Sequence, residues 1–159
     1  MTSDSSSNHI DVSSENLEPP SWGDNLRLYA SAVLRELSIT HWEVSVLLTN
    51  DEGIHRLNAA YRSMDEPTDV LSFSAADEGD AVTSEDGSFF CAGDIVLNVP
   101  MIKRQASEWR VTPEEELRRL IIHGIPHLAG HTHHSTDFAE EPMLRLQEAI
   151  LETVEERIY

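Results

Sequence analysis

The chain has 159 residues, which suits one domain with a sizeable core, and its 40% hydrophobic content is typical of a globular protein. Eleven Lys and Arg residues against 29 Asp and Glu residues give a net charge of −18, which argues against non-specific nucleic-acid binding. No apolar run approaches the ~18 residues of a membrane span. The N-terminus lacks a secretory signal pattern, and a lone cysteine, Cys91, permits no intrachain disulfide, so we expect a cytoplasmic protein.

The first part of the chain alternates predicted strands and helices. Residues 1–8 are rich in Ser and Asp and are expected to be a disordered tail, whereas residues 9–159 are expected to form one domain. A short strand is predicted over 9–13. Apolar residues then recur with helical spacing within 22–39, which predicts the first helix. They are Leu26, Tyr29, Ala30, Val33, Leu34 and Leu37.

The middle of the chain predicts three more strands and a further helix. Alternation and β-branching predict a strand over Trp42–Thr49, and Asn50–Asp51 begins a helix with the sequence DEGIHRLNAAYR. A third strand is expected over Thr68–Ser74. After an acidic, glycine-containing loop, a fourth strand is expected over residues 88–99, in which Gly93–Asp94 indicates a bulge or a close approach.

The clearest helix start lies at Thr112. Thr112 can cap the helix, Pro113 fits its first position, and Glu115 completes a capping box. An apolar stripe follows, and a last helix is predicted over about 140–157, with Met143, Leu146, Ile150 and Val154 facing inward. The predicted class is therefore α+β: a small mixed sheet of about four strands packed with about four helices.

Five of the eight histidines lie in the segment HGIPHLAGHTHH, residues 123–134. His123 and His127 are four apart on a predicted helix, so their rings share one face with Cβ atoms ~5–6 Å apart. Two imidazoles at that spacing can bind one zinc ion at ~2.0–2.1 Å. The metal site is thus predicted on this helix and the turn that follows it.

A catalytic zinc site needs a third ligand. In a continuous helix His133 would lie ~15 Å along the axis from His123, so the helix must end first. Gly130 can provide a C-terminal turn with positive φ, after which His133 can fold back. Three neutral nitrogens with an open position for water favour metal-assisted hydrolysis over a purely structural site. His131 or His134 could replace His133, although we favour surface roles for both.

The spacing HxxxHxxGxxH also occurs in metzincin proteases. Those sites place a Glu directly after the first His as the general base. The corresponding residue here is Gly124, which cannot transfer a proton. The resemblance to a protease therefore fails at the residue on which its chemistry depends.

A second family matches over more of the chain. The histidine segment resembles the signature HGxLHLxGYDH of the YbeY-type rRNA maturation factors. Residues 58–74, NAAYRSMDEPTDVLSFS, resemble that family's N-x-x-Y-R and TDVLSF block, and AGDIVLN, residues 92–98, resembles its GDI strand. PMLRLQEAIL, residues 142–151, resembles its closing helix. The blocks occur in the same order over roughly residues 22–155.

This resemblance implies a single-domain, zinc-dependent endoribonuclease. Such proteins act in maturation of the 3′ end of small-subunit (16S) rRNA and in ribosome quality control. Carried over by position, His123, His127 and His133 are the ligands of one zinc ion, and Arg62 is the catalytic arginine of the cleft. The implied substrate is rRNA and the implied partner is the ribosome or a ribosomal protein. We expect no membrane and no DNA partner.

The residues leave several roles open. Arg62 can hold a phosphate through two hydrogen bonds, or it can form an ordinary ion pair with one of the many carboxylates. Glu108, Asp94 and Glu140 are candidates for the general base by residue type only. The alternatives to a nuclease are a zinc peptidase with a lost or relocated base and a non-catalytic ribosome-assembly factor with structural zinc.

Three departures from the family pattern bear on the site. Pro126 replaces a Leu before the second His and removes a helix hydrogen bond, at a cost of ~3 kcal/mol or more inside a helix. His131 and Thr132 replace the Tyr-Asp pair before the third His, so support of the metal ligands can differ. The acidic loop 77–86 would repel RNA near the cleft. We therefore expect it to point away or to contact a basic partner.

Overall fold

The computed structural model describes residues 8–79, 82–128 and 158. Within them the chain forms a four-stranded sheet and four helices, which confirms the predicted α+β class. In chain order the elements are β2 (His9–Ser14), α1 (Gly23–Glu36), β3 (Trp42–Thr49), α2 (Asp51–Arg62), β4 (Val70–Ser74), β5 (Phe90–Asn98), α3 (Val99–Trp109) and α4 (Pro113–Leu128).

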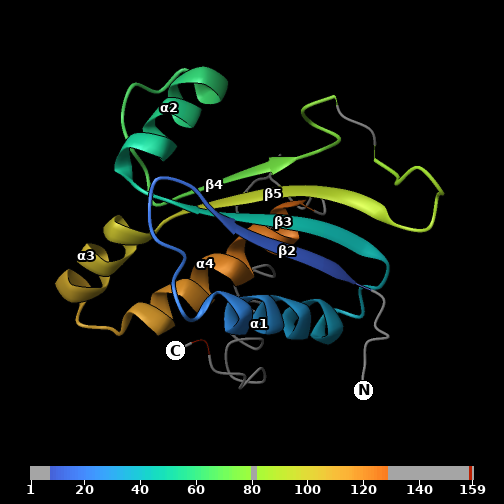
Figure 1. Cartoon of the computed structure of the whole chain (residues 1–159), viewed down its shortest axis with the longest axis horizontal. Helices are drawn as coiled ribbons and strands as arrows, with labels where there is room; N and C mark the ends of the chain where they lie inside the picture. The colour runs from blue at the N-terminus through green and yellow to red at the C-terminus, as the bar shows by residue number, and fades with distance from the viewer. Residues whose placement is uncertain (1–7, 80–81, 129–157, 159) are drawn as a thin grey trace, which may run out of the picture.

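The sheet is mixed, with the strand order β2-β3-β5-β4. The β2, β3 and β5 strands run parallel, whereas β4 pairs antiparallel with β5 and forms one edge. Helices cover both faces: α1 and α4 lie on one side and α2 on the other (Figure 1). Side chains alternate accordingly, so Ile95 and Leu97 of β5 join the core beneath α1 and α4, and Val96 packs in the smaller α2 core.

Gly93 marks both features that the sequence indicated, a bulge and a close approach. The register of β3 against β5 shifts at this point, where Glu43 pairs with Cys91 and Val44 with Gly93. Gly93 has φ 140°, and a Cβ atom there would overlap the carbonyl oxygen of Phe73 on β4. Only glycine fits this position, which brings β4 close to β5.

The α3 helix was not predicted, because it begins at the residue directly after β5. Asn98 ends the strand and is also the N-cap, and Pro100 occupies the first turn. An Asn followed by Pro at the second helical position is the local signal that could have identified this start. Val99, Ile102 and Ala106 form the buried stripe of the helix. The helix predicted over 140–157 lies outside the described residues.

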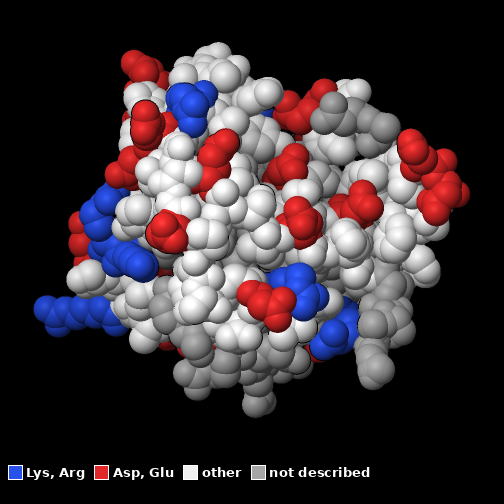
Figure 2. All heavy atoms as spheres, in the orientation of Figure 1, with Lys and Arg blue, Asp and Glu red and all other residues white. Residues whose placement is uncertain are grey.

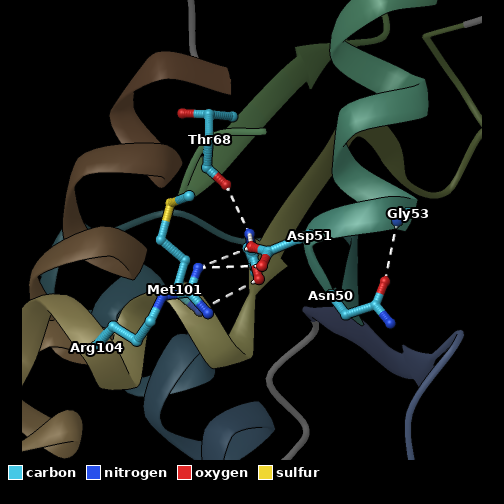
Figure 3. Close-up of polar contacts among 7 residues, drawn as sticks. Asn50, Asp51, Gly53, Thr68, Met101 and Arg104 are labelled. Carbon is cyan, nitrogen blue, oxygen red and sulfur yellow. Dashed lines mark hydrogen bonds and ion pairs between the residues drawn. The ribbon is translucent and has the colours of Figure 1, made fainter. Parts of the chain in front are cut away.

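Asn98 joins four segments at the end of β5, and its partners Asp51, Thr68 and Met101 are labelled in Figure 3. It is fully buried, and its Nδ2 donates to Oδ1 of Asp51 at 2.7 Å and to the carbonyl oxygen of Thr68 at 3.1 Å. Its Oδ1 accepts from the Met101 amide at 3.3 Å. Arg104 reaches the same Asp51 carboxylate at 3.0 Å. One asparagine thus ties α2 and α3 to the segment before β4.

The start of α4 is as predicted. The Glu115 amide donates to Oγ1 of Thr112 at 3.0 Å, and the Thr112 amide donates to Oε1 of Glu115 at 2.8 Å, which is a capping box. The predicted stripe of Leu117, Leu120, Ile121 and Leu128 is buried. Near the C-terminus Ile158 is buried, and its amide donates to Oε2 of Glu114. No helix in the described part of the chain is long and apolar enough to cross a membrane.

Candidate active site

The last two turns of α4 carry His123 and His127 side by side. Their ring centroids are 6.4 Å apart and the rings are tilted by 38°. His123 is exposed and His127 is half-buried, so the pair lies at the margin of the helix face that packs on the sheet. This arrangement follows from the four-residue spacing on a helix. It fits two imidazole donors to a single metal ion.

The third predicted ligand, His133, lies outside the described residues, together with Gly130, His131, Thr132 and His134. The described part of the chain contains no group of three or more His, Cys, Asp and Glu side chains that could hold a metal ion. A three-ligand site built on His123 and His127 therefore requires a donor from outside the described residues, as the predicted ligand His133 would be.

Pro126 lies within α4 and does not end it, because the helix continues to Leu128. The missing amide means that the Ile122 carbonyl receives no hydrogen bond from this position. The side chains of Ile122 and Pro126 are both buried, and this apolar burial offsets part of the lost hydrogen-bond energy. The structure thus keeps both histidines on the same helix despite the proline.

Gly124 faces the sheet. A Cβ atom at this position would lie 3.0 Å from Cδ1 of Ile95 and 3.3 Å from Oγ of Ser72. The glycine therefore allows α4 to approach β4 and β5 closely. A Glu in its place would meet Ile95 and Ser72, so the protease arrangement also conflicts with how this helix packs.

Arg62, the last residue of α2, is held by several contacts. Its Nη2 donates to the Ser72 carbonyl oxygen at 3.0 Å, and its Nη1 donates to the Tyr61 carbonyl oxygen at 3.2 Å. Its Cζ lies 4.5 Å from the ring centroid of Phe73, a cation–π distance. The side chain is 37% exposed. The guanidinium is thus oriented at the edge strand and still reaches solvent.

Ser72 connects Arg62 with the histidine helix. Its carbonyl oxygen accepts from Arg62, and its hydroxyl lies beside Gly124, the residue after His123. The predicted phosphate-binding group and the predicted metal helix therefore meet at one residue of β4. The sequence predicted a strand over Thr68–Ser74, and β4 forms within it over Val70–Ser74, but the sequence did not single out Ser72.

Glu78 lies against Arg62, with 3.4 Å between Oε2 and Nη1. The expectation that the acidic loop points away is wrong at this residue. The ion-pair alternative for Arg62 is therefore realised, with weak geometry at this distance. No local pattern could have found this contact, since the two residues are 16 apart in the chain.

The candidates for a general base are dispersed. Asp94 is exposed on β5, Glu108 is exposed on α3, and Glu140 lies outside the described residues. Sequence reasoning overlooked Glu116, one turn into α4, whose side chain is only 4% exposed. Burial raises the pKa of its carboxyl. The charge of Arg119 lowers this pKa, and the negative charge of Asp69 raises it further.

Surface charge gives no broad site for a polyanion on the face seen in Figure 2. Acidic side chains are spread over the sheet and α2, and basic side chains gather over α3 and α1. Attraction of a phosphate would therefore depend on local groups such as Arg62 and on a bound metal ion.

Comparisons with known proteins find one family over nearly the whole chain. The family described as "Endoribonuclease YbeY" matches residues 9–155. Proteins of that name from Treponema denticola and Treponema pallidum (strain Nichols) are 44% identical over 148 residues and 40% identical over 144 residues. The alignments cover 91% of this chain in both cases, and 92% and 88% of the two relatives.

A solved structure is also similar. The solution structure of TM1509 from Thermotoga maritima superposes with a TM-score of 0.64 at 30% identity, covering 91% of this chain and 88% of that one. The family match spans nearly the whole chain and includes α4 and Arg62. This chain belongs to the endoribonuclease YbeY family.

Proposed function

We propose that the protein is a zinc-dependent endoribonuclease that acts in maturation of the 3′ end of small-subunit rRNA and in ribosome quality control. The observation that carries the proposal is the meeting of the His123–His127 helix with Arg62 at Ser72. Family membership supports RNA as the substrate. A histidine pair and an oriented arginine whose elements both contact Ser72 of the edge strand β4 suit hydrolysis of a phosphodiester.

His123 and His127, with His133 from outside the described residues, would hold one zinc ion. When bound, zinc supplies a Lewis acid and lowers the pKa of a bound water towards ~7. The contribution of the chain is to present neutral imidazoles on a fixed helix. Gly124 keeps that helix against β4, which holds the histidines near the edge strand.

Arg62 would bind the phosphate next to the cleaved bond. Its planar guanidinium can donate two parallel hydrogen bonds to phosphate oxygens and stabilise the charge that develops on them. The contacts to Ser72 and Phe73 already orient it, which reduces the entropy lost on binding. Binding a phosphate would compete with the Glu78 carboxylate for Nη1.

The wider setting of the activity is part of the same proposal. A net charge of −18 disfavours unaided attraction to RNA, which supports delivery of the substrate on a ribosome or by a ribosomal protein. A lone cysteine fits a cytoplasmic location.

The test compares the wild-type protein with Arg62→Ala and His127→Ala on a transcript that spans the 3′ end of small-subunit rRNA. We expect the wild type to cleave the transcript and each variant to lose at least about 100-fold in rate, as on removal of one electrostatic donor. Trp109→Ala, an exposed aromatic on α3, is the control and should cleave normally.

The outcomes separate the candidate functions. Cleavage that survives both substitutions would refute the proposed roles of Arg62 and His127. Hydrolysis of peptides in place of RNA would favour a peptidase. Bound metal without hydrolysis of either substrate would favour an assembly factor with structural zinc.

A further inference from the structure

Tyr61 is an exposed aromatic residue next to Arg62. It is 57% exposed, although most aromatic residues in the described part of the chain are more buried. A phenol ring that is exposed to water to this extent does not contribute the stabilising free energy that its burial would give. Its position at the end of α2 places it directly beside the arginine proposed to bind phosphate.

The ring of Tyr61 is held in place by Phe73. The two ring centroids are 5.4 Å apart with an interplanar angle of 65°, an edge-on contact. Phe73 is 8% exposed, and its ring also supports the guanidinium of Arg62. One buried ring on β4 therefore fixes an exposed aromatic ring and a cationic group next to each other.

This combination matches the chemistry of a single nucleotide. Proteins bind unpaired bases by stacking them on aromatic rings and bind the adjoining phosphate through Arg or Lys. A fixed aromatic ring loses little conformational entropy when a base stacks on it. Tyr61 and Arg62 are consecutive, so a base and a neighbouring phosphate of one strand can reach both.

We propose that Tyr61 is a nucleobase-stacking residue that positions the RNA strand whose phosphate is bound by Arg62. The proposal rests on the proposed function, since it assigns the base that accompanies the phosphate at the same site. It adds a subsite on the α2 side of β4, whereas the histidine helix lies on the opposite face of the sheet. The bound RNA would thus pass across β4, the edge strand of the sheet.

The test measures single-turnover cleavage with a set of RNA oligonucleotides that each lack one base near the cleavage position. For wild-type protein, loss of one particular base should raise the half-saturating protein concentration about five- to 150-fold, the range expected for one stacked base. Tyr61→Leu should raise it by a similar factor with intact RNA. It should then show no further loss with the RNA that lacks that base.

Three controls exclude a purely structural role for Tyr61. Tyr61→Phe keeps the ring and should behave like the wild type. Trp109→Leu removes a comparably exposed aromatic residue, 56% exposed, outside this group and should also behave like the wild type. Thermal unfolding of Tyr61→Leu reports whether the variant is folded, and Tyr61→Ser provides a second variant without a ring.

The possible failures are distinguishable. The subsite is wrong if intact RNA is bound equally well by wild type and Tyr61→Leu, or if the penalty for the missing base persists in Tyr61→Leu. It is also wrong if no single base matters to the wild type. If the wild type neither binds nor cleaves any RNA, the proposed function fails, and the subsite fails with it.

Discussion

The guanidinium of Arg62 and the carboxylate of Glu78 form an ion pair, with 3.4 Å between Nη1 and Oε2. The pair is partly exposed, at 37% and 26% for the two side chains, so its own contribution to stability is small. Its importance is positional. If Arg62 binds a phosphate as proposed, this carboxylate competes with the phosphate oxygens for Nη1.

Glu78→Gln should therefore strengthen RNA binding, because Arg62 no longer has a charged competitor. We expect a dissociation constant about two- to fivefold lower, the range of a weak exposed ion pair. Fluorescence anisotropy with a labelled rRNA fragment measures it. Glu85→Gln removes the same charge from the same loop and serves as the control. Equal effects of the two substitutions would mean that only net charge matters.

Gly124→Glu restores the residue that a metzincin carries after its first His, yet it should create no peptidase. The side chain would enter the contact with Ile95 and Ser72, so we expect a loss of about 3 kcal/mol or more in unfolding free energy. Gly124→Ala adds only a Cβ atom and should cost less. Urea unfolding and a peptide-hydrolysis assay are the measurements. A stable, peptide-cleaving Glu variant would contradict the packing described here.

Asn98→Ala should destabilise the fold by about 2–4 kcal/mol, because it removes a helix cap and the three hydrogen bonds made by a fully buried side chain. Arg104→Gln removes the other, exposed partner of Asp51 and should cost less than about 1 kcal/mol. Denaturant unfolding of both variants tests the contrast. Similar losses in the two would show that Asn98 is not the principal link.

The same asparagine gives a prediction for acid stability. The hydrogen bond from Asn98, followed by that from Arg104, lowers the pKa of Asp51 from 3.8. A lowered folded-state pKa stabilises the protein above pH 3.8, and this contribution disappears as pH falls through the folded-state pKa. Asn98→Ala should therefore lose less stability than the wild type below pH 4, as measured by unfolding at several pH values.

Glu116 should act in the opposite sense. Burial raises the pKa of its carboxyl above 4.5, so the unfolded chain ionises first and stability falls as pH rises above that value. Within the described residues its Oε1 has no hydrogen-bond partner. Glu116→Gln should therefore add roughly 1–3 kcal/mol at pH 7 and almost nothing at pH 4. Glu18→Gln in an exposed loop is the control; a gain at pH 4 equal to that at pH 7 would exclude ionisation as the cause.

Local sequence patterns predicted the elements whose signals are complete within a few residues. Asn50 caps α2 through the Gly53 amide, and the helix has the predicted bounds. The capping box at Thr112 begins α4 at Pro113, as expected. In contrast, α3 was missed because Asn98 ends a strand and caps a helix at once. No turn residues separate β5 from α3, so the usual sequence signal for a new helix is missing.

The candidate site was predictable only in part. The spacing of His123 and His127 fixes their proximity, since it depends on a single helix. The contacts of Arg62 with Ser72 and Glu78 depend on how α2, β4 and a loop meet in space, which no spacing encodes. The role of His133 stays a prediction.

The central claim is that the histidines of α4 hold the metal ion on which RNA cleavage depends. The most direct test removes metal from the purified protein with a chelator, adds back one equivalent of zinc, and measures both bound metal and cleavage of the rRNA transcript. We predict that the wild-type protein loses bound metal and cleavage activity together on chelation and regains them together with zinc. We predict that His123→Ala and His127→Ala regain neither bound metal nor cleavage. Full cleavage by metal-free protein, or by the histidine variants without bound metal, would contradict the claim.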